Sequence, residues 1–169
     1  EFNWMLLGFS PYVTLLNLAV PRERESNFTW VVADGRYLPF KEGAFELAYS
    51  NSVIEHLGIF ENQQLFAAEC RRVGRRYYVQ TPNKWFFVEP HLITPFIHWL
   101  PRGIQKVLLR NLTVWGWITR PSREYCESFM REVRLLDKVE LRQLFPDADI
   151  IHERFLGVSK SIIAVKASG

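Results

Sequence analysis

Polar residues that could bind a ligand follow two neighbouring apolar runs, residues 30–33 and 45–50. Both runs are bounded by turn residues, which is typical of buried strands. Asp34 comes directly after the first run, and a Ser-Asn-Ser cluster at 50–52 closes the second. Ligands bind outside the carboxyl ends of strands in an open parallel sheet. The carboxylate and the polar cluster are therefore predicted to face the same crevice.

Two histidines stand where a general base would be useful. His56 lies just after the second run, and His91 lies in a loop after a later predicted strand, residues 75–81. An imidazole has an ordinary pKa of about 6.5, so it can take a proton from a hydroxyl or an amine near neutral pH. Each histidine is also compatible with a structural or surface role, so the choice of base stays open.

The stretch from 33 to 57 resembles the class I S-adenosylmethionine-dependent methyltransferases, in particular the methyltransferase type 11-like domains. The resemblance rests on four pieces in the family's order and at its usual spacing: Ala-Asp-Gly at 33–35, Leu-Pro-Phe at 38–40, Phe-Glu-Leu-Ala at 45–48 and Ser-Val-Ile-Glu-His-Leu at 52–57. It extends over residues 2–166. It implies a doubly wound, Rossmann-like, mostly parallel α/β sheet, with S-adenosylmethionine as the cofactor.

The resemblance also implies the cofactor-binding residues. Asp34 would accept a hydrogen bond from the adenine amino group, and the backbone N–H groups after it would donate to ring nitrogens. The turn at 50–52 would lie beside the methionine portion and the transferred methyl group. Asn17 stands where the family usually has an acidic residue for the ribose hydroxyls, and an amide can still donate and accept hydrogen bonds. The full set is Asn17, Asp34, Gly35, Arg36, Ser50, Asn51 and Ser52.

The family's glycine-rich turn is missing from the sequence. That turn and the strand before it would precede Phe2, and no Gly-x-Gly-x-Gly occurs in the 169 residues. The first strand and helix are therefore expected to be missing or incomplete, either in a fragment or in a degenerate relative. The 169 residues alone are expected to bind the cofactor weakly. Ser52 stands where metal-binding relatives have the first Glu of Glu-x-x-Glu-His, so no metal site is expected.

Hydrophobic periodicity predicts the elements that position these residues. A helix over 59–73 would turn Ile59, Phe66, Cys70 and Val73 inward and leave Gln63 in water. The other predicted elements are helices at 2–7, 104–112 and 138–145, and strands at 12–18, 75–81, 150–155 and 161–165. The alternation of strands and helices predicts an α/β fold independently of the resemblance.

Residues 84–136 break this alternation and are predicted to form a cap inserted into a single domain that spans 1–169. The block is rich in aromatic residues and poor in acidic ones. Apolar walls with a few polar groups suit small-molecule pockets, so the cap favours methyl transfer to a small or lipid-like acceptor. The alternative is a catalytically incomplete domain that binds a partner or a membrane surface. The residues available for such a surface are Trp99, Arg102, Lys106, Arg110, Trp115 and Trp117.

Composition is that of one globular domain, with 48% hydrophobic and 23% charged residues. A net charge of +3 does not indicate nucleic-acid binding, so no nucleic-acid partner is expected. Cys70 and Cys126 are far apart and predicted to be reduced, and no signal peptide begins the sequence, so a cytoplasmic location is expected. Prolines and arginines interrupt every apolar run well short of the roughly 20 residues of a membrane span. The oligomeric state stays open.

Overall fold

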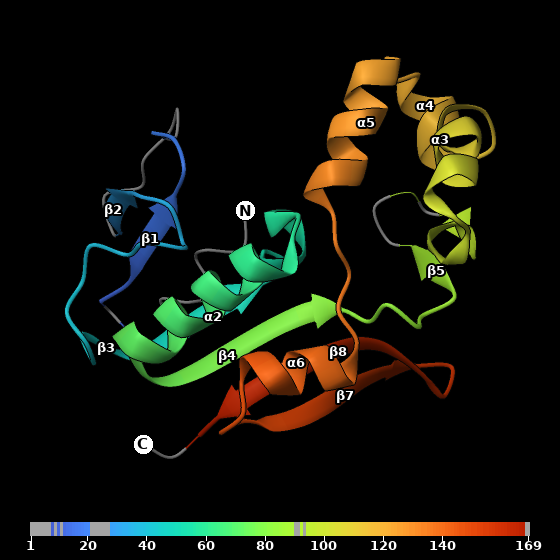
Figure 1. Cartoon of the computed structure of the whole chain (residues 1–169). Helices are drawn as coiled ribbons and strands as arrows, with labels where there is room; N and C mark the ends of the chain where they lie inside the picture. Colours follow the sequence, from blue (N-terminus) through green and yellow to red (C-terminus); the bar gives the residue numbers. More distant parts are fainter. Residues whose placement is uncertain are drawn as a thin grey trace.

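The computed structural model describes residues 8, 10, 12–20, 28–89, 92 and 94–167, and it shows a mixed α/β arrangement (Figure 1). The helix predicted at 2–7 lies outside the described residues. The strands predicted from the apolar runs are all present, and their ends agree with the predictions to within a few residues.

One interruption, between Pro82 and Lys138, divides the order of strands and helices along the chain. Before it come β1 (Thr14–Asn17), β2 (Thr29–Val32), β3 (Phe45–Asn51), the short 3-10 helix η1 (Ile54–Leu57), α2 (Phe60–Val73) and β4 (Gly74–Pro82). The interruption contains β5 (Val88–Glu89), β6 (Thr94–Pro95), the 3-10 helix η2 (Ile97–Trp99), α3 (Arg102–Asn111), α4 (Val114–Thr119) and α5 (Arg123–Glu132). After it come α6 (Lys138–Leu144), β7 (Asp149–Phe155) and β8 (Val158–Lys166).

The sheet topology is that of a doubly wound fold with a gap. The larger sheet has the order β3-β4-β8-β7, in which β3 and β4 are parallel and the last pairings are antiparallel. β1 and β2 form a separate parallel pair, in register from Thr14 opposite Thr29 to Asn17 opposite Val32. Among the described residues, no strand joins β1 to β3. In the described part of the chain, the two parallel pairs β1–β2 and β3–β4 therefore belong to separate sheets.

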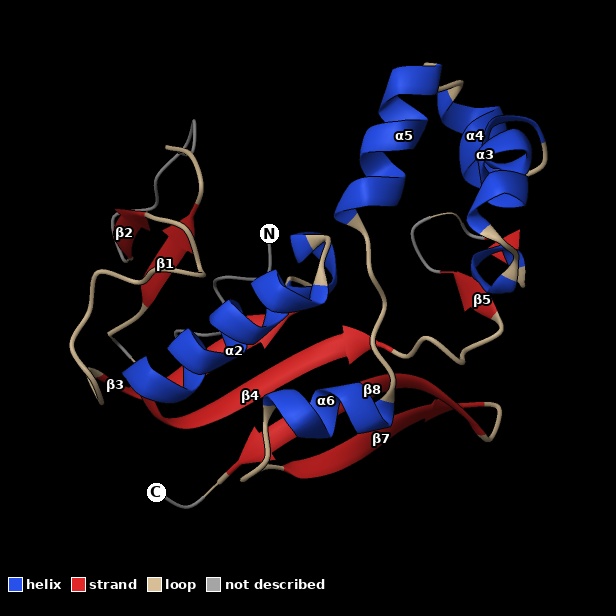
Figure 2. Cartoon of the chain, in the orientation of Figure 1, coloured by secondary structure: helices blue, strands red, loops and turns tan. Residues whose placement is uncertain are grey.

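The main core lies on one face of the four-stranded sheet, where α2 and α6 pack (Figure 2). It is centred on Tyr77, Val79, Phe145 and Ile162, none of which is more than 1% exposed. The α6 helix begins at a capping box in which Asp137 accepts from two backbone N–H groups. That box fixes where the helix starts and so where it lies against the sheet.

β3 is covered on one face only, so the prediction that this strand is buried is wrong for its other face. Leu47 and Tyr49 are 52% and 50% exposed, while Ser50 on the other face is buried. Side chains alternate between the two faces of a strand, and the described helices cover only one face of this sheet (Figure 1). Tyr49 instead stacks on Tyr78 of β4, with ring centroids 5.3 Å apart.

The α2 helix also differs from the prediction at two residues. Ile59 precedes the helix as its N-cap and is 56% exposed, whereas Gln63 is fully buried. Gln63 tolerates burial because its amide is satisfied: Nε2 donates to the backbone oxygens of Ile54 and Arg134, at 3.0 and 2.9 Å. A buried polar group with its hydrogen bonds made loses little by leaving water.

The cap, defined as residues 84–136, has a small hydrophobic cluster of its own. Leu92, Ile97, Leu109, Cys126 and Met130 form this cluster, which is separate from the main core. Thr113 and Ser122 cap the N-termini of α4 and α5 with their side-chain oxygens. Figure 1 shows the three cap helices beyond the carboxyl end of β4, the edge at which the candidate site lies.

Candidate functional site

The turn after β2 presents Asp34 at the carboxyl end of that strand. Its carboxylate accepts from the backbone N–H of Arg36 at 2.9 Å and from the guanidinium of the same residue, with Nε 3.0 Å from each oxygen. These hydrogen bonds, those from the side chain first, lower the pKa of Asp34 below its ordinary value. The carboxylate is thus held ionised in one orientation by its neighbour two residues along the chain.

Asn62 joins this turn to the segment after β3. Arg36 Nη1 donates to Asn62 Oδ1 at 3.0 Å, and Asn62 Nδ2 donates to the backbone oxygen of Leu57 at 2.9 Å. Asn62 lies in the first turn of α2, and Leu57 ends η1. The structure therefore brings together the two strand ends that the sequence predicts to share a crevice. Asn62 was not predicted as a site residue, because its only sequence signal is its place at a helix start.

Gly35 is required by a close approach between the turn and α2. A Cβ built on Gly35 would lie 2.9 Å from two ring carbons of Phe66, and Phe66 is buried in the core. Only glycine lets the backbone pass this close without moving the ring. The position of the Asp34 turn is therefore set by the same helix that carries Asn62.

The end of β3 supplies a buried hydroxyl and a strained turn. Ser50 is 7% exposed, and its Oγ has no hydrogen-bond partner among the described residues. Asn51 is exposed, and Ser52 adopts a φ of 54°, in the left-handed region that non-glycine residues rarely enter. Gln80 of β4 supports the turn, because its backbone oxygen accepts from Ser52 N–H at 3.1 Å. Strain of this kind is often found where a binding site must be shaped.

The Glu55-His56 pair divides into one buried and one exposed side chain. Glu55 is 0% exposed and its Oε2 accepts from Thr81 Oγ1 of β4 at 2.9 Å. His56 is exposed on η1, at the carboxyl edge of β3. A general base must be reachable by its substrate, and an exposed side chain meets that requirement. His91, the second candidate base, lies outside the described residues.

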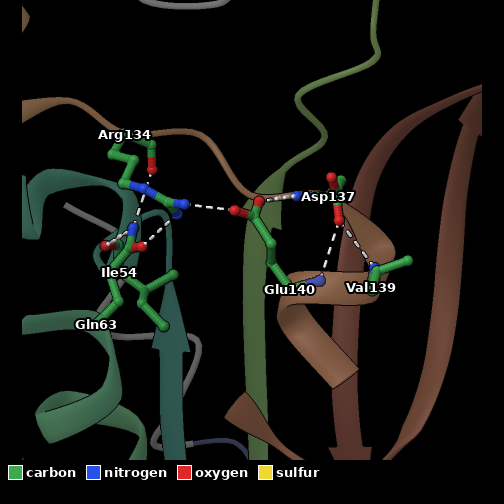
Figure 3. A network of polar contacts seen from close by, with 6 residues as sticks. All are labelled: Ile54, Gln63, Arg134, Asp137, Val139 and Glu140. Atoms are coloured by element: carbon green, nitrogen blue, oxygen red, sulfur yellow. Dashed lines mark hydrogen bonds and ion pairs between the residues drawn. The ribbon is translucent and has the colours of Figure 1, made fainter. Parts of the chain in front are cut away.

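A polar network behind η1 fixes its position (Figure 3). Arg134, in the segment that returns from the cap, donates from Nη1 to Gln63 Oε1 at 2.8 Å and forms an ion pair with Glu140 of α6. Its backbone N–H donates to the carbonyl of Glu55 at 2.7 Å, and its guanidinium lies 4.9 Å from the ring centroid of Phe60. This network was not predicted, because it joins residues far apart in the sequence.

Asn17, the predicted ribose contact, is the last residue of β1 and is exposed. Its backbone oxygen accepts from Ala33 N–H at 3.0 Å, so it lies beside the chain that leads into Asp34. The described part of the chain contains no group of three or more His, Cys, Asp or Glu side chains that could hold a metal ion. The site thus offers hydrogen-bond donors and acceptors, with one exposed imidazole.

A family comparison covers the residues that form this site. Residues 4–76 match the family model described as a methyltransferase domain. That segment contains every candidate cofactor-binding residue, together with Asn62 and His56. No protein of curated function matches the chain.

Solved structures show a shared fold over nearly the whole chain. A SAM-dependent methyltransferase from Methanosarcina mazei is 15% identical, with a TM-score of 0.53 over 98% of this chain and 87% of its own. The 1,6-didemethyltoxoflavin-N1-methyltransferase of Burkholderia thailandensis, solved with its substrate and S-adenosylhomocysteine, is 12% identical, with a TM-score of 0.55 over 96% of this chain and 63% of its own.

A third similar structure is described as a different class of enzyme. A protein from Rhodobacter sphaeroides described among the Zn-dependent alcohol dehydrogenases is 14% identical, with a TM-score of 0.58 over 96% of this chain and 78% of its own. At these identities the likeness shows the fold alone, which unrelated activities share. The family match favours a methyltransferase over a dehydrogenase, because it covers the segment that holds the candidate site. Residues 4–76 are thus similar to a methyltransferase domain, and the chain shares its fold with S-adenosylmethionine-dependent methyltransferases.

Proposed function

We propose that this domain transfers a methyl group from S-adenosylmethionine to a small or lipid-like acceptor. The observation that carries the proposal is the joining of two strand ends at one edge of the fold. The Asp34 turn after β2 is tied through Arg36 and Asn62 to η1, which follows β3. Such an edge is where open parallel sheets bind their ligands.

The residues present fit the proposed cofactor. Ser50 Oγ is buried, and no described residue meets it, so a polar ligand group at the end of β3 would satisfy it. The Ser50–Ser52 turn would hold the methionine portion, Asp34 the adenine amino group and Asn17 the ribose hydroxyls. The cofactor supplies an electrophilic methyl group on a sulfonium sulfur.

Arg36 sets a condition on how Asp34 binds adenine. Each oxygen of the Asp34 carboxylate already accepts two of the hydrogen bonds that Arg36 donates. A carboxylate has about four acceptor sites in all. An adenine amino group must therefore share this carboxylate with the guanidinium or displace it, and Arg36 regulates the affinity.

His56 is the proposed base for a hydroxyl or amine acceptor. It is exposed at the carboxyl edge, so it could accept the proton that the acceptor loses as its new bond to carbon forms. His91 remains the second candidate. Orientation and exclusion of water supply much of the acceleration when the nucleophile is already good.

The cap supports the choice of an apolar acceptor. Trp85, Phe96 and Trp99 are 60%, 52% and 45% exposed on it, so they are available to contact a bound molecule. The alternative, a catalytically incomplete binding domain, is not favoured by the family match. A cytoplasmic location also belongs to the proposal, and it is supported by Cys70 and Cys126, which are both buried and not joined in a disulfide.

Saturation-transfer NMR of S-adenosylmethionine with the 169-residue chain tests the proposal, because it detects weak ligands. We expect saturation at the adenine protons, and its loss in Asp34→Ala. Glu46→Ala is the matched control, since Glu46 is also a carboxylate paired with an arginine but lies at the start of β3. Absence of saturation in the wild-type chain, or equal signals in both variants, would contradict the assigned site.

A further inference from the structure

The outer surface of α3 and α4 exposes large apolar side chains in a row along the sequence. Ile104 and Val107 of α3 are 48% and 69% exposed, and Trp117 and Ile118 of α4 are 66% and 73% exposed. The link between the helices adds Leu112, which is 61% exposed. Large apolar side chains that gather on the surface of a folded domain mark a place of interaction, and these five are candidates for one.

These side chains are not cap core left uncovered, because the cap fills its core with other residues. Leu109 is buried, and Leu108 packs against the cap cluster. Trp115 stacks against Phe129 and Tyr125 of α5, with ring centroids 5.5 and 5.9 Å away. The two tryptophans of α4 are thereby separated, with Trp115 packed inward and Trp117 exposed, and Trp115 drops out of the surface predicted from sequence.

The charge of this segment has one sign. Residues 90–123 contain no Asp or Glu, and their cations are Arg102, Lys106, Arg110, Arg120 and Arg123. Lys106 Nζ lies 3.6 Å from Glu127 Oε1, and both side chains are more than half exposed. An exposed pair of this kind is weak, so Lys106 can exchange that partner for another anion.

A hollow between the two helices combines the apolar and cationic parts. It has a volume of about 330 Å³ and is lined by Asn111, Gly116, Trp117 and Arg120. The indole N–H of Trp117 donates to the backbone oxygen of Asn111, which holds the ring over the end of α3. A guanidinium beside an indole suits a phosphate group that adjoins an apolar chain.

We propose that the α3–α4 surface, defined by Ile104, Val107, Trp117, Ile118 and Arg120, docks on an anionic lipid bilayer. The apolar side chains enter the boundary between headgroups and acyl chains, Trp117 lies at headgroup level, and the cations meet lipid phosphates. Among the described residues, no helix is long and apolar enough to cross a membrane, so the contact is peripheral. The proposal goes beyond methyl transfer and does not depend on it.

Co-sedimentation with vesicles tests the apolar part. We expect the 169-residue chain to sediment with phosphatidylcholine vesicles that contain phosphatidylglycerol, and Val107→Glu to weaken this binding by about tenfold or more. Val139→Glu is the matched control, because Val139 is also a helical valine, 67% exposed against 69% for Val107, but lies on α6. Equal losses in the two variants would overturn the proposal.

Charge and salt test the other part. The double variant Arg102→Gln, Arg120→Gln should bind anionic vesicles about fivefold more weakly for each cation removed. The control pair Arg71→Gln, Arg75→Gln lies in a basic hollow beside the amino ends of β3 and β4 and should bind as the wild type does. A loss confined to the control pair, or binding to pure phosphatidylcholine that equals binding to anionic vesicles, would refute this surface.

Circular dichroism of each variant separates lost docking from lost folding. The saturation-transfer signal of S-adenosylmethionine should be unchanged in Val107→Glu, because α3 lies outside the candidate site. Failure of cofactor binding therefore leaves the docking proposal standing, and failure of docking leaves the enzyme proposal standing. If Val107→Glu abolished self-association and left vesicle binding intact, the partner would be a second copy of the chain and the lipid proposal would be wrong.

Discussion

At the scale of single residues, Asp34 shows how a short sequence sets the state of a binding group. Its turn provides a backbone N–H and a guanidinium from the same residue, Arg36, and both are hydrogen-bonded to the carboxylate. The pKa of Asp34 is lowered for this reason. The group therefore reaches any ligand in its ionised form throughout the neutral range.

Replacing Arg36 by Gln should make the free energy of unfolding depend less on pH in the acid range. Because the folded pKa of Asp34 is depressed, its contribution is present above the ordinary carboxyl pKa, about 3.9, and is lost as pH falls through the lower folded value. Urea unfolding of wild type and Arg36→Gln should show a difference at neutral pH that narrows below about pH 4. A difference that stays constant down to the lowest pH would mean that Arg36 acts through packing alone.

Burial raises the pKa of the Cys70 thiol to about 12. The thiolate is the reactive form, so Cys70 should resist alkylation by iodoacetamide in the folded protein even at mildly alkaline pH. Mass spectrometry of Cys126→Ser, which leaves one thiol, measures this directly. The same variant in urea is the control and should be labelled completely, and rapid labelling without urea would contradict the packing of α2 against the sheet.

At the scale of elements, two glycines differ in whether the structure leaves room for a side chain. Gly58 follows η1 with a φ of 76°, and an added Cβ would lie 2.7 Å from the backbone oxygen of Arg131 at the end of α5. Gly103 in α3 has nothing within 4 Å of the same built atom. Gly58 therefore allows the close contact between α5 and η1, whereas Gly103 can be substituted without a clash.

Gly58→Ala should lower the free energy of unfolding by about 1–3 kcal/mol, because it adds both backbone strain and a steric clash. Gly103→Ala should leave it unchanged or raise it by up to about 1 kcal/mol, since alanine is the better helix former. Urea titrations of the two variants make the comparison. Equal effects would mean that the contact between Gly58 and α5 is not maintained in solution.

Arg134 is the residue through which the returning cap segment holds α2 and α6. Arg134→Met should cost about 1–3 kcal/mol of unfolding free energy, because the buried Gln63 amide oxygen and the Glu140 carboxylate lose their donor. Arg142→Met, at an exposed position of α6, is the control and should change it by about 0.5 kcal/mol at most. Equal losses of unfolding free energy in Arg134→Met and Arg142→Met would show that the contacts of Arg134 do not stabilise the fold specifically.

The sequence predicted strands better than contacts, for physical reasons that differ by element. The sequence patterns located β1 to β4, β7 and β8 but not the two-residue strands β5 and β6, and they did not reveal that β3 is covered on one side only. Gln63 was misplaced although it lies three residues before Phe66, on the same helical stripe, because its burial depends on two carbonyls distant in sequence. Asn62 and Arg134 act through partners that only the fold brings near. Within residues 84–136, Thr113 and Ser122 are N-cap residues, and their residue types could have predicted where α4 and α5 begin. Hydrophobic periodicity alone does not use this information.

At the scale of the whole molecule, the two hydrophobic clusters do not share members. The chain crosses between them near Asn83, which bridges to Leu136, and Lys84 N–H donates to the Leu136 carbonyl at 2.9 Å. The connection is therefore a pair of short extended segments, reinforced by Arg134 and by the contact at Gly58.

Two separate cores joined by so narrow a connection imply two cooperative units with different opening free energies. Backbone amides of α3, α4 and α5 should exchange with deuterium through opening of the cap alone, while those of β4 and β8 should exchange only when the whole sheet unfolds. Hydrogen-exchange mass spectrometry would resolve the two populations. A substitution on the cap surface can thus melt its own unit and leave the sheet's melting temperature untouched, so local exchange, rather than global melting, reports whether the cap is intact.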